Sequence, residues 1–381
     1  MEGQRTITIV ERRREGASAI LHLRGVVLPE GVRRGVFVVD GRITFRAPSE
    51  ASTVVDGGYL LPGLVDAHAH LGLASPAAPG AGPAERARES ARAQLEAGVL
   101  VIREPGGPNR SSAGIGPHEG LPRTFTGGRF LAPPGTYFAG LAREVTEAEL
   151  PDAAEEEARA SGAWAKVIGD WPGADGTMRL NYRPEILAEA VRRVHAAGAR
   201  MAVHAITAAT VEAAIEAGFD SIEHGEGLQE DHIAAMAARG IALVPTLTIL
   251  PMLPDFIAGL GLGRTATQAM LAAVRRHPEM TRKAVEAGVL VLAGTDAGMG
   301  PHGMIGEEIR LLTEAGVPPK AALAAGSWVA RRYLGLPGIE EGAPADIVAY
   351  ADDPCNDLSA LQRPLLRILD GRLMLASGVA A

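Results

Sequence analysis

The sequence contains a single cysteine, Cys355, among its 381 residues. One cysteine excludes an intrachain disulfide bond and a metal site built from several thiolates. Long apolar runs are also missing, since no segment reaches the length of a membrane-spanning helix and the amino-terminal residues lack the apolar core of a signal peptide. We therefore expect a cytoplasmic protein.

The chain also lacks an excess of positive charge and has very little lysine. The formal net charge of −8 gives no electrostatic reason to expect binding to nucleic acid or to an anionic membrane. The expected partner is a small-molecule substrate, and a homo-oligomer is compatible with the sequence. Only three of the 37 basic residues are lysines, namely Lys166, Lys283 and Lys320. Because lysine can lose its proton and arginine cannot, each lysine is a candidate for chemistry that arginine cannot supply.

Short β-like segments separated by turns occupy both ends of the chain. The amino-terminal segments are Thr6–Val10, Ala19–Leu23, Val36–Val39 and Arg42–Phe45. Asp40-Gly41 is a hairpin signal, and a second Asp-Gly turn follows at Asp370-Gly371 between the apolar segments near the carboxyl end. These patterns predict one small sheet assembled from both ends of the chain, in residues 1–59 and 338–381.

The middle of the chain, residues 60–337, alternates short apolar strands with alanine-rich amphipathic helices. Eight strands are expected to end near His70, Arg103, Leu131, Lys166, His204, His224, Thr246 and Asp296. The expected helices between them include residues 84–97, 184–197, 208–217, 231–239 and 280–287. Eight strand–helix units predict a (β/α)8 TIM barrel. An open doubly wound sheet fits less well, because no glycine-rich nucleotide fingerprint follows the first strand.

Residues that can bind metal ions lie at or near the expected ends of these strands. Asp66, His68 and His70 alternate along one strand and therefore share a face, where two imidazoles could bind one cation. The alternative is a pair of ordinary surface histidines at a strand end. In a barrel the carboxyl ends of the strands converge on one rim. The residues expected to meet there are His68, His70, Lys166, His204, His224 and Asp296.

The motifs around these residues resemble those of a known superfamily. The sequence reads PGLVDAHAH at His68 and His70, AVHA at His204, SIEHG at His224 and GTDAG at Asp296. In this order they resemble the amidohydrolase superfamily of metal-dependent hydrolases, in the branch of imidazolonepropionase-like enzymes and prolidase-like metal dipeptidases. The tail GLPGIEEGAPADIVAYADDP resembles the return of the chain into that family's small β-sandwich. The resemblance therefore implies a β-sandwich domain built from residues 1–59 and 338–381.

The resemblance implies two divalent ions, usually zinc. His68, His70 and Asp296 would hold the more buried ion, and His204 and His224 the other. It further implies a metal-activated hydroxide that attacks an amide carbonyl, with the metal at His204 and His224 polarising that carbonyl. Asp296 would take the proton of the hydroxide and pass it to the leaving nitrogen, so that Asp296 and His224 are the predicted catalytic residues.

Lys166 occupies the position at which two-metal members carry a carboxylated lysine, whose new carboxylate bridges both ions. Burial beside cations disfavours an ammonium group and leaves an amine able to take up carbon dioxide. The alternative for Lys166 is an ordinary salt bridge to Asp170. If only one ion is bound, the resemblance favours a mononuclear deaminase or an imidazolone-type ring hydrolase instead. A binding protein on a degenerate barrel is a third interpretation, but it predicts lost ligands, and each expected ligand type is present.

Substrate contacts are less well defined by the sequence. Arg103 and Tyr137 follow the second and third strands, where they could hold a substrate carboxylate. His118 and His302 lie on expected loops and could line the pocket. Asp66 is expected to be a buried hydrogen-bonding group rather than a metal ligand. The resemblance implies an amide substrate of a peptide-like, acyl-amino-acid or cyclic kind.

The remaining histidines are expected to be structural or superficial. They are His195, His232 and His277 in outward-facing helical positions, and His22 in the amino-terminal sheet. One loop departs from the family pattern. Residues 131–140 read LAPPGTYFAG, whereas dipeptidase-like relatives carry a Gly-Gly-His-Gly type of loop there. A loop histidine that could contact substrate is therefore missing, which leaves the substrate undefined.

Overall fold

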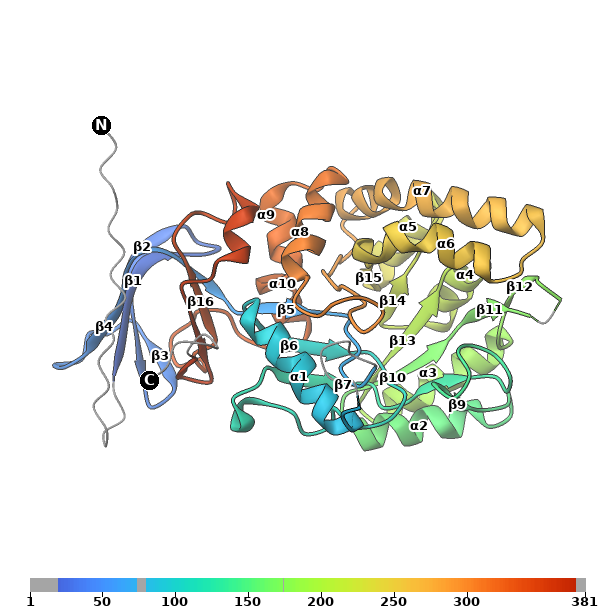
Figure 1. Cartoon of the computed structure of the whole chain (residues 1–381), viewed down its shortest axis with the longest axis horizontal. Helices are drawn as coiled ribbons and strands as arrows, with labels where there is room; N and C mark the ends of the chain where they lie inside the picture. The colour runs from blue at the N-terminus through green and yellow to red at the C-terminus, as the bar shows by residue number, and fades with distance from the viewer. Residues whose placement is uncertain (1–19, 74–79, 174, 375–381) are drawn as a thin grey trace.

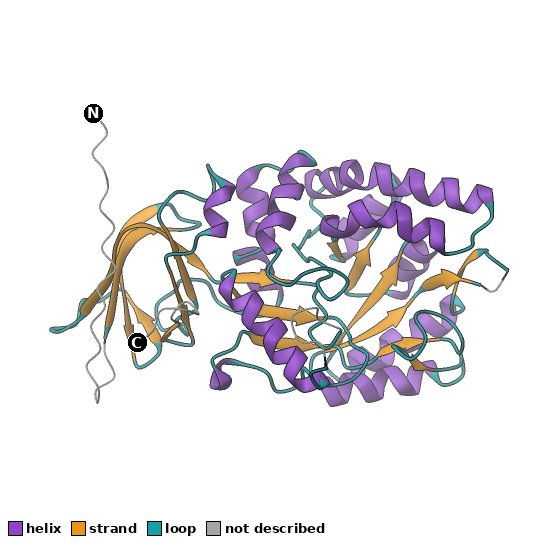
Figure 2. Ribbon diagram, in the orientation of Figure 1, coloured by secondary structure: helices purple, strands orange, loops and turns teal. Residues whose placement is uncertain are grey.

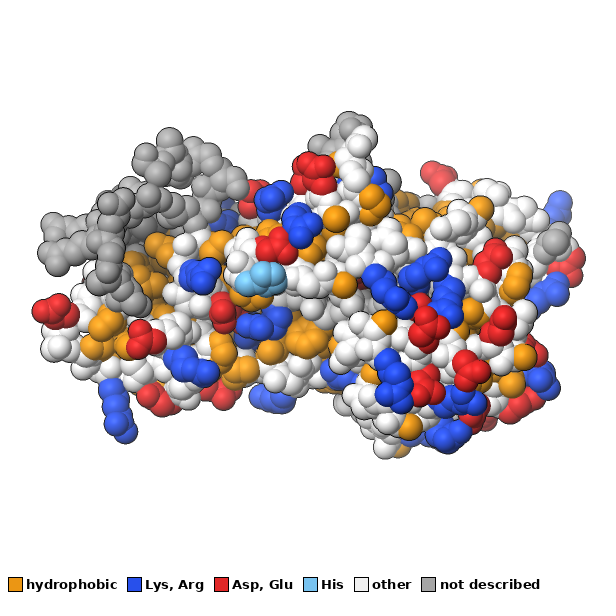
Figure 3. All heavy atoms as spheres, turned by 90° about the horizontal axis from the view of Figure 1, so that it is seen from below, with side chains coloured by type: hydrophobic (Ala, Val, Ile, Leu, Met, Phe, Trp, Pro, Cys, Tyr) orange, Lys and Arg blue, Asp and Glu red, His pale blue; other side chains and the backbone are white. Residues whose placement is uncertain are grey.

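The computed structural model describes residues 20–73, 80–173 and 175–374. It has a mixed α/β fold with an all-β region at one end and a larger region of strands and helices beside it (Figure 1). In the larger region helices lie on both sides of the strands (Figure 2). Acidic and basic side chains are interspersed over the face shown in Figure 3. The strand predicted at Thr6–Val10 lies outside the described residues.

The all-β region is one seven-stranded sheet built from both ends of the chain, in the order β18-β17-β16-β4-β1-β2-β3. Its strands are β1 (Leu21–Val27), β2 (Val32–Val39), β3 (Arg42–Thr44), β4 (Ser52–Pro62), β16 (Ile347–Tyr350), β17 (Leu366–Leu369) and β18 (Arg372–Met374). Both Asp-Gly turns are present. Asp40 and Gly41 have φ of 50° and 79°, the left-handed conformation that a two-residue hairpin requires. Within the described ranges these strands form one sheet from both ends of the chain, as the sequence pattern predicts.

The larger region contains a three-stranded and a six-stranded sheet, in the orders β5-β6-β7 and β15-β14-β13-β10-β8-β9, with all neighbours parallel. The strands are β5 (Leu64–Asp66), β6 (Val99–Glu104), β7 (Arg123–Thr126), β8 (Phe130–Ala132), β9 (Arg143–Glu144), β10 (Trp164–Ile168), β13 (Arg200–Ala205), β14 (Ser221–His224) and β15 (Ala242–Val244). A separate hairpin pairs β11 (Asp170–Pro172) with β12 (Met178–Leu180). Most residues of the parallel strands are buried, as expected for sheets covered by helices.

Two features separate these sheets from the closed barrel that the sequence predicts. The third expected strand is divided into β7, which pairs with β6, and β8, which pairs with β10. The chain steps between them at Gly127, where a Cβ atom would lie 2.2 Å from the Pro105 carbonyl oxygen. The eighth expected strand has only isolated bridges, including Val291 with Leu243. Backbone hydrogen bonds nevertheless join this eighth segment, residues 290–296, to β15 and to the residues after β5.

The helices agree closely with the sequence pattern. They are α1 (Pro83–Glu96), α2 (Leu150–Ser161), α3 (Pro184–Ala196), α4 (Ala208–Ala217), α5 (Glu230–Arg239), α6 (Leu253–Gly259), α7 (Arg264–Glu286), α8 (Ile305–Glu314), α9 (Pro319–Ala325) and α10 (Trp328–Tyr333). Four predicted helices are observed within one residue at each end. Helix α7 is far longer than predicted because it continues through Pro278, a residue that usually ends a helix. None of the helices described is long and apolar enough to cross a membrane.

A buried ion pair joins the terminal sheet to the larger region. The guanidinium of Arg331 in α10 lies 3.1 Å from the carboxylate of Asp346, just before β16, and each side chain is only 1% exposed. Asp346 also accepts a hydrogen bond from the backbone N–H of Asp370, and its own carbonyl accepts one from Gly63 N–H between β4 and β5. Asp346 therefore joins three chain segments at the boundary of the two regions, two through its carboxylate and one through its carbonyl.

We expect Asp346→Ala to lower the free energy of unfolding by about 3–5 kcal/mol, because it leaves the buried Arg331 guanidinium without its partner. Urea unfolding followed by circular dichroism measures the change. The matched control is Asp56→Ala, which breaks an exposed Arg24–Asp56 pair of 2.6 Å and should leave the midpoint almost unchanged. Equal effects of the two substitutions would contradict this account of the boundary.

Candidate metal centre and adjoining pocket

His68 and His70 follow directly after β5, where backbone contacts fix their positions. Asp66, the last residue of β5, accepts hydrogen bonds from the backbone N–H of His68 and from the N–H and hydroxyl of Thr295. The His68 carbonyl in turn accepts from the N–H of Asp296 at 2.7 Å. Asp66 is thus a buried hydrogen-bonding group, as predicted, and it links the histidine segment to the segment that carries Asp296.

The hydrogen bonds of the two imidazoles define which nitrogen faces the site. His68 Nδ1 lies 2.7 Å from a carboxylate oxygen of Glu223, and His70 Nδ1 lies 2.7 Å from the carbonyl oxygen of Gly106. Both partners are acceptors, so each Nδ1 is the protonated nitrogen and each Nε2 carries a free electron pair. Burial lowers the pKa of His70 to about 4, which keeps that imidazole neutral at physiological pH.

The Nε2 atoms of His68 and His70 lie next to the carboxylate of Asp296. The Nε2 atoms of His68 and His70 lie 3.1 Å apart, and Asp296 Oδ1 lies 3.3 Å and 3.1 Å from them. Lys166 Nζ is 3.2 Å from His68 Nε2.

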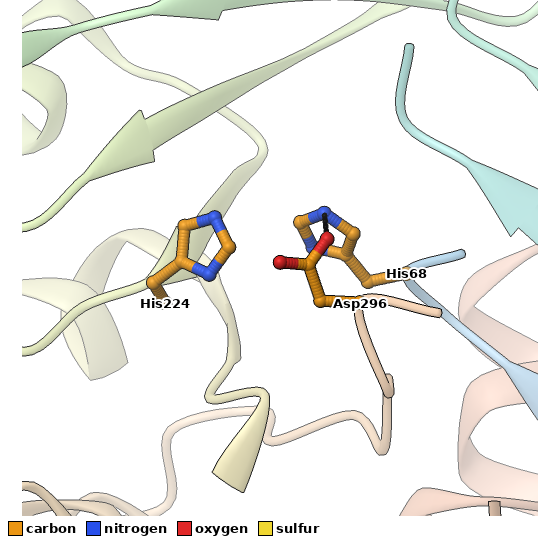
Figure 4. Close-up of side chains that lie close together, drawn as sticks. All are labelled: His68, His224 and Asp296. Carbon is orange, nitrogen blue, oxygen red and sulfur yellow. Dashed lines mark ion pairs between the residues drawn. The ribbon is translucent and has the colours of Figure 1, made fainter. Parts of the chain in front are cut away.

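His204 and His224 close the cluster from the neighbouring strands β13 and β14. Their rings are 4.6 Å apart, and the His224 ring is 5.0 Å from that of His68. One ligand atom from each of His68, His224 and Asp296 lies within 4.8 Å of the other two. Figure 4 shows His68 and Asp296 joined by their ion pair, with the ring of His224 facing them. The structure therefore brings the six predicted cluster residues together.

Backbone strain helps to aim two of these side chains. His224 and Asp296 have φ of 68° and 51°, values that non-glycine residues seldom adopt. The turn at His224 directs its ring toward the cluster, and its Nδ1 lies 2.9 Å from the Thr246 hydroxyl. His204 Nε2 has no hydrogen-bond partner. Burial, followed by the charge of Lys166, lowers the pKa of His204 to about 3, so its electron pair is free.

Lys166 is buried within this cluster and makes no ion pair with any described residue. Burial lowers the pKa of its amine to about 8. The alternative salt bridge to Asp170 is not observed. The Asp170 carboxylate instead accepts hydrogen bonds from the N–H groups of Ile206 and Thr207 at the end of β13.

Arg103 does not take the position expected of a substrate contact. Its side chain is fully buried and donates to Glu223 at 2.6 Å, to the Ser221 hydroxyl at 2.8 Å and to the Ala67 carbonyl at 2.6 Å. Glu223 therefore links Arg103 to His68. Glu223 was not predicted as a site residue, although the SIEHG motif contains it. Despite complete burial, the nearby Arg103 and His68 keep the pKa of Glu223 well below its usual range.

The other predicted substrate contacts are dispersed. Tyr137 borders the pocket next to the cluster. His118 lies on the short 3-10 helix Pro117–Glu119 with its side chain 70% exposed, apart from the cluster. His302 is half-buried, 3.5 Å from Gln94, and burial lowers its pKa to about 4. It does not border the pocket that Tyr137 lines.

Two of the histidines expected to face outward are buried instead. His277 in α7 is fully buried and donates from Nε2 to the Pro245 carbonyl, which follows β15, at 2.9 Å. His232 is 8% exposed, and its Nδ1 accepts from the Gln229 N–H at the start of α5. Both serve backbone groups that would otherwise lack a partner. His195 is exposed and pairs with Asp220 at 2.8 Å, as a surface role requires.

A pocket opens beside the cluster. Besides His70, Lys166, His204, His224 and Asp296, its lining includes aromatic, aliphatic and methionine side chains and the carboxyl group of Glu226. Glu226 is 4% exposed and has one carboxyl oxygen without a hydrogen-bond partner. Apart from Tyr137, the aromatic, aliphatic and methionine residues that line this pocket could not be recognised in the sequence, because they come from loops and helix faces that carry no motif.

Comparison with known proteins identifies relatives over most of the chain. The model of the amidohydrolase family matches residues 59–373. An uncharacterized protein of Mycobacterium tuberculosis is 41% identical over 355 residues, covering 92% of this chain and 95% of that protein. Ochratoxinase of Aspergillus niger is 29% identical over 191 residues, covering 48% of this chain and 39% of that protein.

Solved structures share the fold. A Xaa-Pro dipeptidase with bound methionine superimposes with a TM-score of 0.79 at 22% identity, covering 93% of this chain and 99% of the other. The structure of A. niger ochratoxinase gives a TM-score of 0.76 at 20% identity, covering 95% and 97%. At these identities the likeness concerns the fold.

We expect Glu223→Ala to destabilise the protein by about 3–5 kcal/mol, since it leaves the Arg103 guanidinium buried without a carboxylate. Ser221→Ala is the control, because it removes one hydroxyl from the same network and should cost about 1 kcal/mol. Urea unfolding measures both. The double substitution Arg103→Met with Glu223→Leu should recover much of the lost stability, and a failure of Glu223→Ala to exceed the control would show that the pair is unimportant.

Proposed function

This chain belongs to the amidohydrolase family, and from that premise we propose that it hydrolyses an amide bond with divalent metal ions bound by the cluster around His68 and Asp296. As a member of this family it is an enzyme that acts on carbon–nitrogen bonds. The substrate would be peptide-like, an acyl-amino acid or a cyclic amide. The names of the related ochratoxinase and Xaa-Pro dipeptidase support a hydrolytic reaction.

The observation that carries the proposal is the meeting of three electron-pair donors. His68 Nε2, His70 Nε2 and Asp296 Oδ1 lie within 3.3 Å of one another. Three unprotonated acceptors at such distances repel one another in a buried site unless a cation is bound between them. Imidazole nitrogen and carboxylate oxygen are the ligands that zinc accepts. The residues present therefore fit a metal ion.

We assign the residues to two ions as follows. His68, His70 and Asp296 would hold one ion, His204 and His224 the other, and Lys166 would bridge them as a carboxylated lysine. The unpartnered Nε2 of His204 supports the second ion. A neutral Lys166 amine can add to carbon dioxide, forming an N–C bond with release of one proton, and its buried position without an anionic partner supports this modification.

When bound, the ions supply a water of lowered pKa and polarise the substrate carbonyl. The protein side chains orient the reaction. Glu223 and the Gly106 carbonyl keep His68 and His70 in the tautomer that exposes Nε2. Asp296, held by the backbone contact to His68, would accept the proton of the attacking water and transfer it to the leaving nitrogen.

A one-ion enzyme is the second candidate. His68, His224 and Asp296 alone provide three ligand atoms within 4.8 Å of one another, which is enough for a single catalytic zinc. Such a site would suit a mononuclear deaminase or an imidazolone-type ring hydrolase. Lys166 forms no direct ion pair with a described carboxylate, and this favours the two-ion assignment, in which Lys166 would itself carry the bridging carboxylate.

We further propose a (β/α)8 barrel over residues 60–337 and a β-sandwich domain over residues 1–59 and 338–381. The hydrogen bonds of residues 290–296 to both neighbouring segments support the barrel, and the pairing of β16 with β4 supports a domain shared by the two ends. A cytoplasmic location and a homo-oligomeric state stay predictions.

We expect the purified protein to hold about two zinc ions per chain and Lys166→Ala to hold about one, because the substitution removes the bridging group. Metal analysis after gel filtration measures the content. Lys320→Ala, at an exposed position, is the control and should keep both ions. One zinc per chain in all three proteins would favour the mononuclear candidate.

Asp296→Asn should lower kcat on an amide substrate by about 10²–10⁴-fold, since the amide side chain cannot accept the proton of the attacking water. Substrates are chosen from a panel of dipeptides, acyl-amino acids, lactams and neutral amides assayed with zinc-loaded protein. Asp175→Asn, at an exposed ion pair with Arg179, is the control. A variant that keeps full activity with unchanged zinc content would exclude Asp296 from proton transfer.

A further inference from the structure

The pocket beside the cluster has a continuous aromatic wall. Tyr137 and Trp171 pack with ring centroids 4.8 Å apart, Phe138 and Trp171 with centroids 5.2 Å apart, and Phe138 and Phe256 with centroids 5.9 Å apart. These rings come from three separate segments, namely the loop after β8, the strand β11 and the helix α6. Trp171 also lies 5.9 Å from the His204 ring, so the wall reaches the cluster.

Methionine and aliphatic side chains extend this wall. Met270 and Val274 from α7 line the pocket on one side, and Met252 and Met299 line its rim. Met252 and Met299 are 42% and 40% exposed, which is unusual for such large apolar side chains in a soluble protein. A flexible, polarizable methionine surface beside aromatic rings suits a bulky apolar ligand group.

Positive charge is almost missing from the pocket. Among its described lining residues Lys166 provides the single basic side chain besides the imidazoles, and it belongs to the cluster. Arg103 is the arginine that the sequence suggested as a contact for a substrate carboxylate. It instead forms a fully buried ion pair with Glu223. The Glu226 carboxyl group, whether neutral or ionised, adds no positive charge. A substrate carboxylate would therefore lose its hydration without gaining a cationic partner on the wall.

Building on the proposed function, we infer that the substrate is an uncharged amide with a bulky aromatic or branched apolar group, and not a dipeptide with a free carboxylate. Hydrolysis breaks the C–N bond, forms a C–O bond to water and delivers a proton to the nitrogen, giving a carboxylate and an amine. The apolar group occupies the wall formed by Tyr137, Trp171 and Phe256. The unpartnered oxygen of Glu226 accepts a hydrogen bond from the amide N–H.

The test compares phenylacetanilide with 4-(phenylacetylamino)benzoate, which has the same scissile bond and an added carboxylate. Both are assayed with the zinc-loaded full chain, together with the dipeptide Phe-Pro. We expect kcat/KM for the neutral anilide to exceed that of either charged compound by about tenfold or more, because the charge is buried without a partner. Equal or faster cleavage of the charged compounds would overturn the inference and leave amide hydrolysis established.

A binding measurement separates this inference from the proposed function. The dissociation constants of the same anilide pair are measured with the full-length Asp296→Asn variant by titration calorimetry. Tighter binding of the neutral anilide by about tenfold supports the apolar substrate class even if the native chain cleaves neither compound, in which case the proposed function fails alone. Equal binding of both compounds, or binding of neither, overturns the inference.

A variant at the rim provides a matched control. Met252→Arg places a cation at an exposed position of the wall, and Met252→Gln changes the same side chain without adding charge. The arginine should shift the ratio of dissociation constants toward the carboxylate compound by about two- to fivefold, as expected of a partly exposed ion pair. Met252→Gln should shift this ratio of dissociation constants much less. Equal shifts from the two substitutions would show that charge does not set the preference, contrary to the inference.

Discussion

The site is governed by the close packing of electron-pair donors that are almost fully buried. His68 Nδ1 lies 2.7 Å from the Glu223 carboxylate and His70 Nδ1 donates to the Gly106 carbonyl, so their Nε2 atoms face Asp296 Oδ1 at 3.3 Å and 3.1 Å. Such an arrangement is unfavourable in a low dielectric unless positive charge lies among the donors. The surrounding hydrogen bonds hold it in place, which is what a binding site for a cation requires.

Much of this centre could be predicted from the sequence because its residues stand at the ends of parallel strands. The strands end at one edge of their sheets, so residues separated by more than 200 positions, such as His68 and Asp296, become neighbours. The scarcity of lysine was informative in the same way. Lys166 is buried in the cluster, whereas Lys320 is exposed and Lys283 forms an ion pair with Glu230 at the surface.

Features of the site that depend on strand register and on local backbone strain could not be predicted from the sequence. In a regular strand Glu223 and His224 would face opposite sides. His224 instead adopts a φ of 68° at the end of β14. As a result both side chains approach His68, the Glu223 carboxylate at 2.7 Å and the His224 ring at a centroid distance of 5.0 Å. Sequence periodicity cannot reveal that reversal. Nor could it show that Arg103 is bound inside the fold by Glu223. The continuous path of α7 through Pro278 similarly placed His277 in the core instead of at the surface.

Chemistry and substrate preference come from different parts of this chain. The cluster lies at strand ends and is fixed by backbone contacts, whereas the pocket wall comes from the loop around Tyr137, the β11 hairpin and the stretch from Leu247 to α7. Loops and added helices can change without moving strand ends. A fold shared with a Xaa-Pro dipeptidase at 22% identity is therefore compatible with a wall that lacks a cation for a carboxylate. Under the proposed function, the residues of that wall, rather than those of the cluster, would determine which amide can approach the proposed metal ligands.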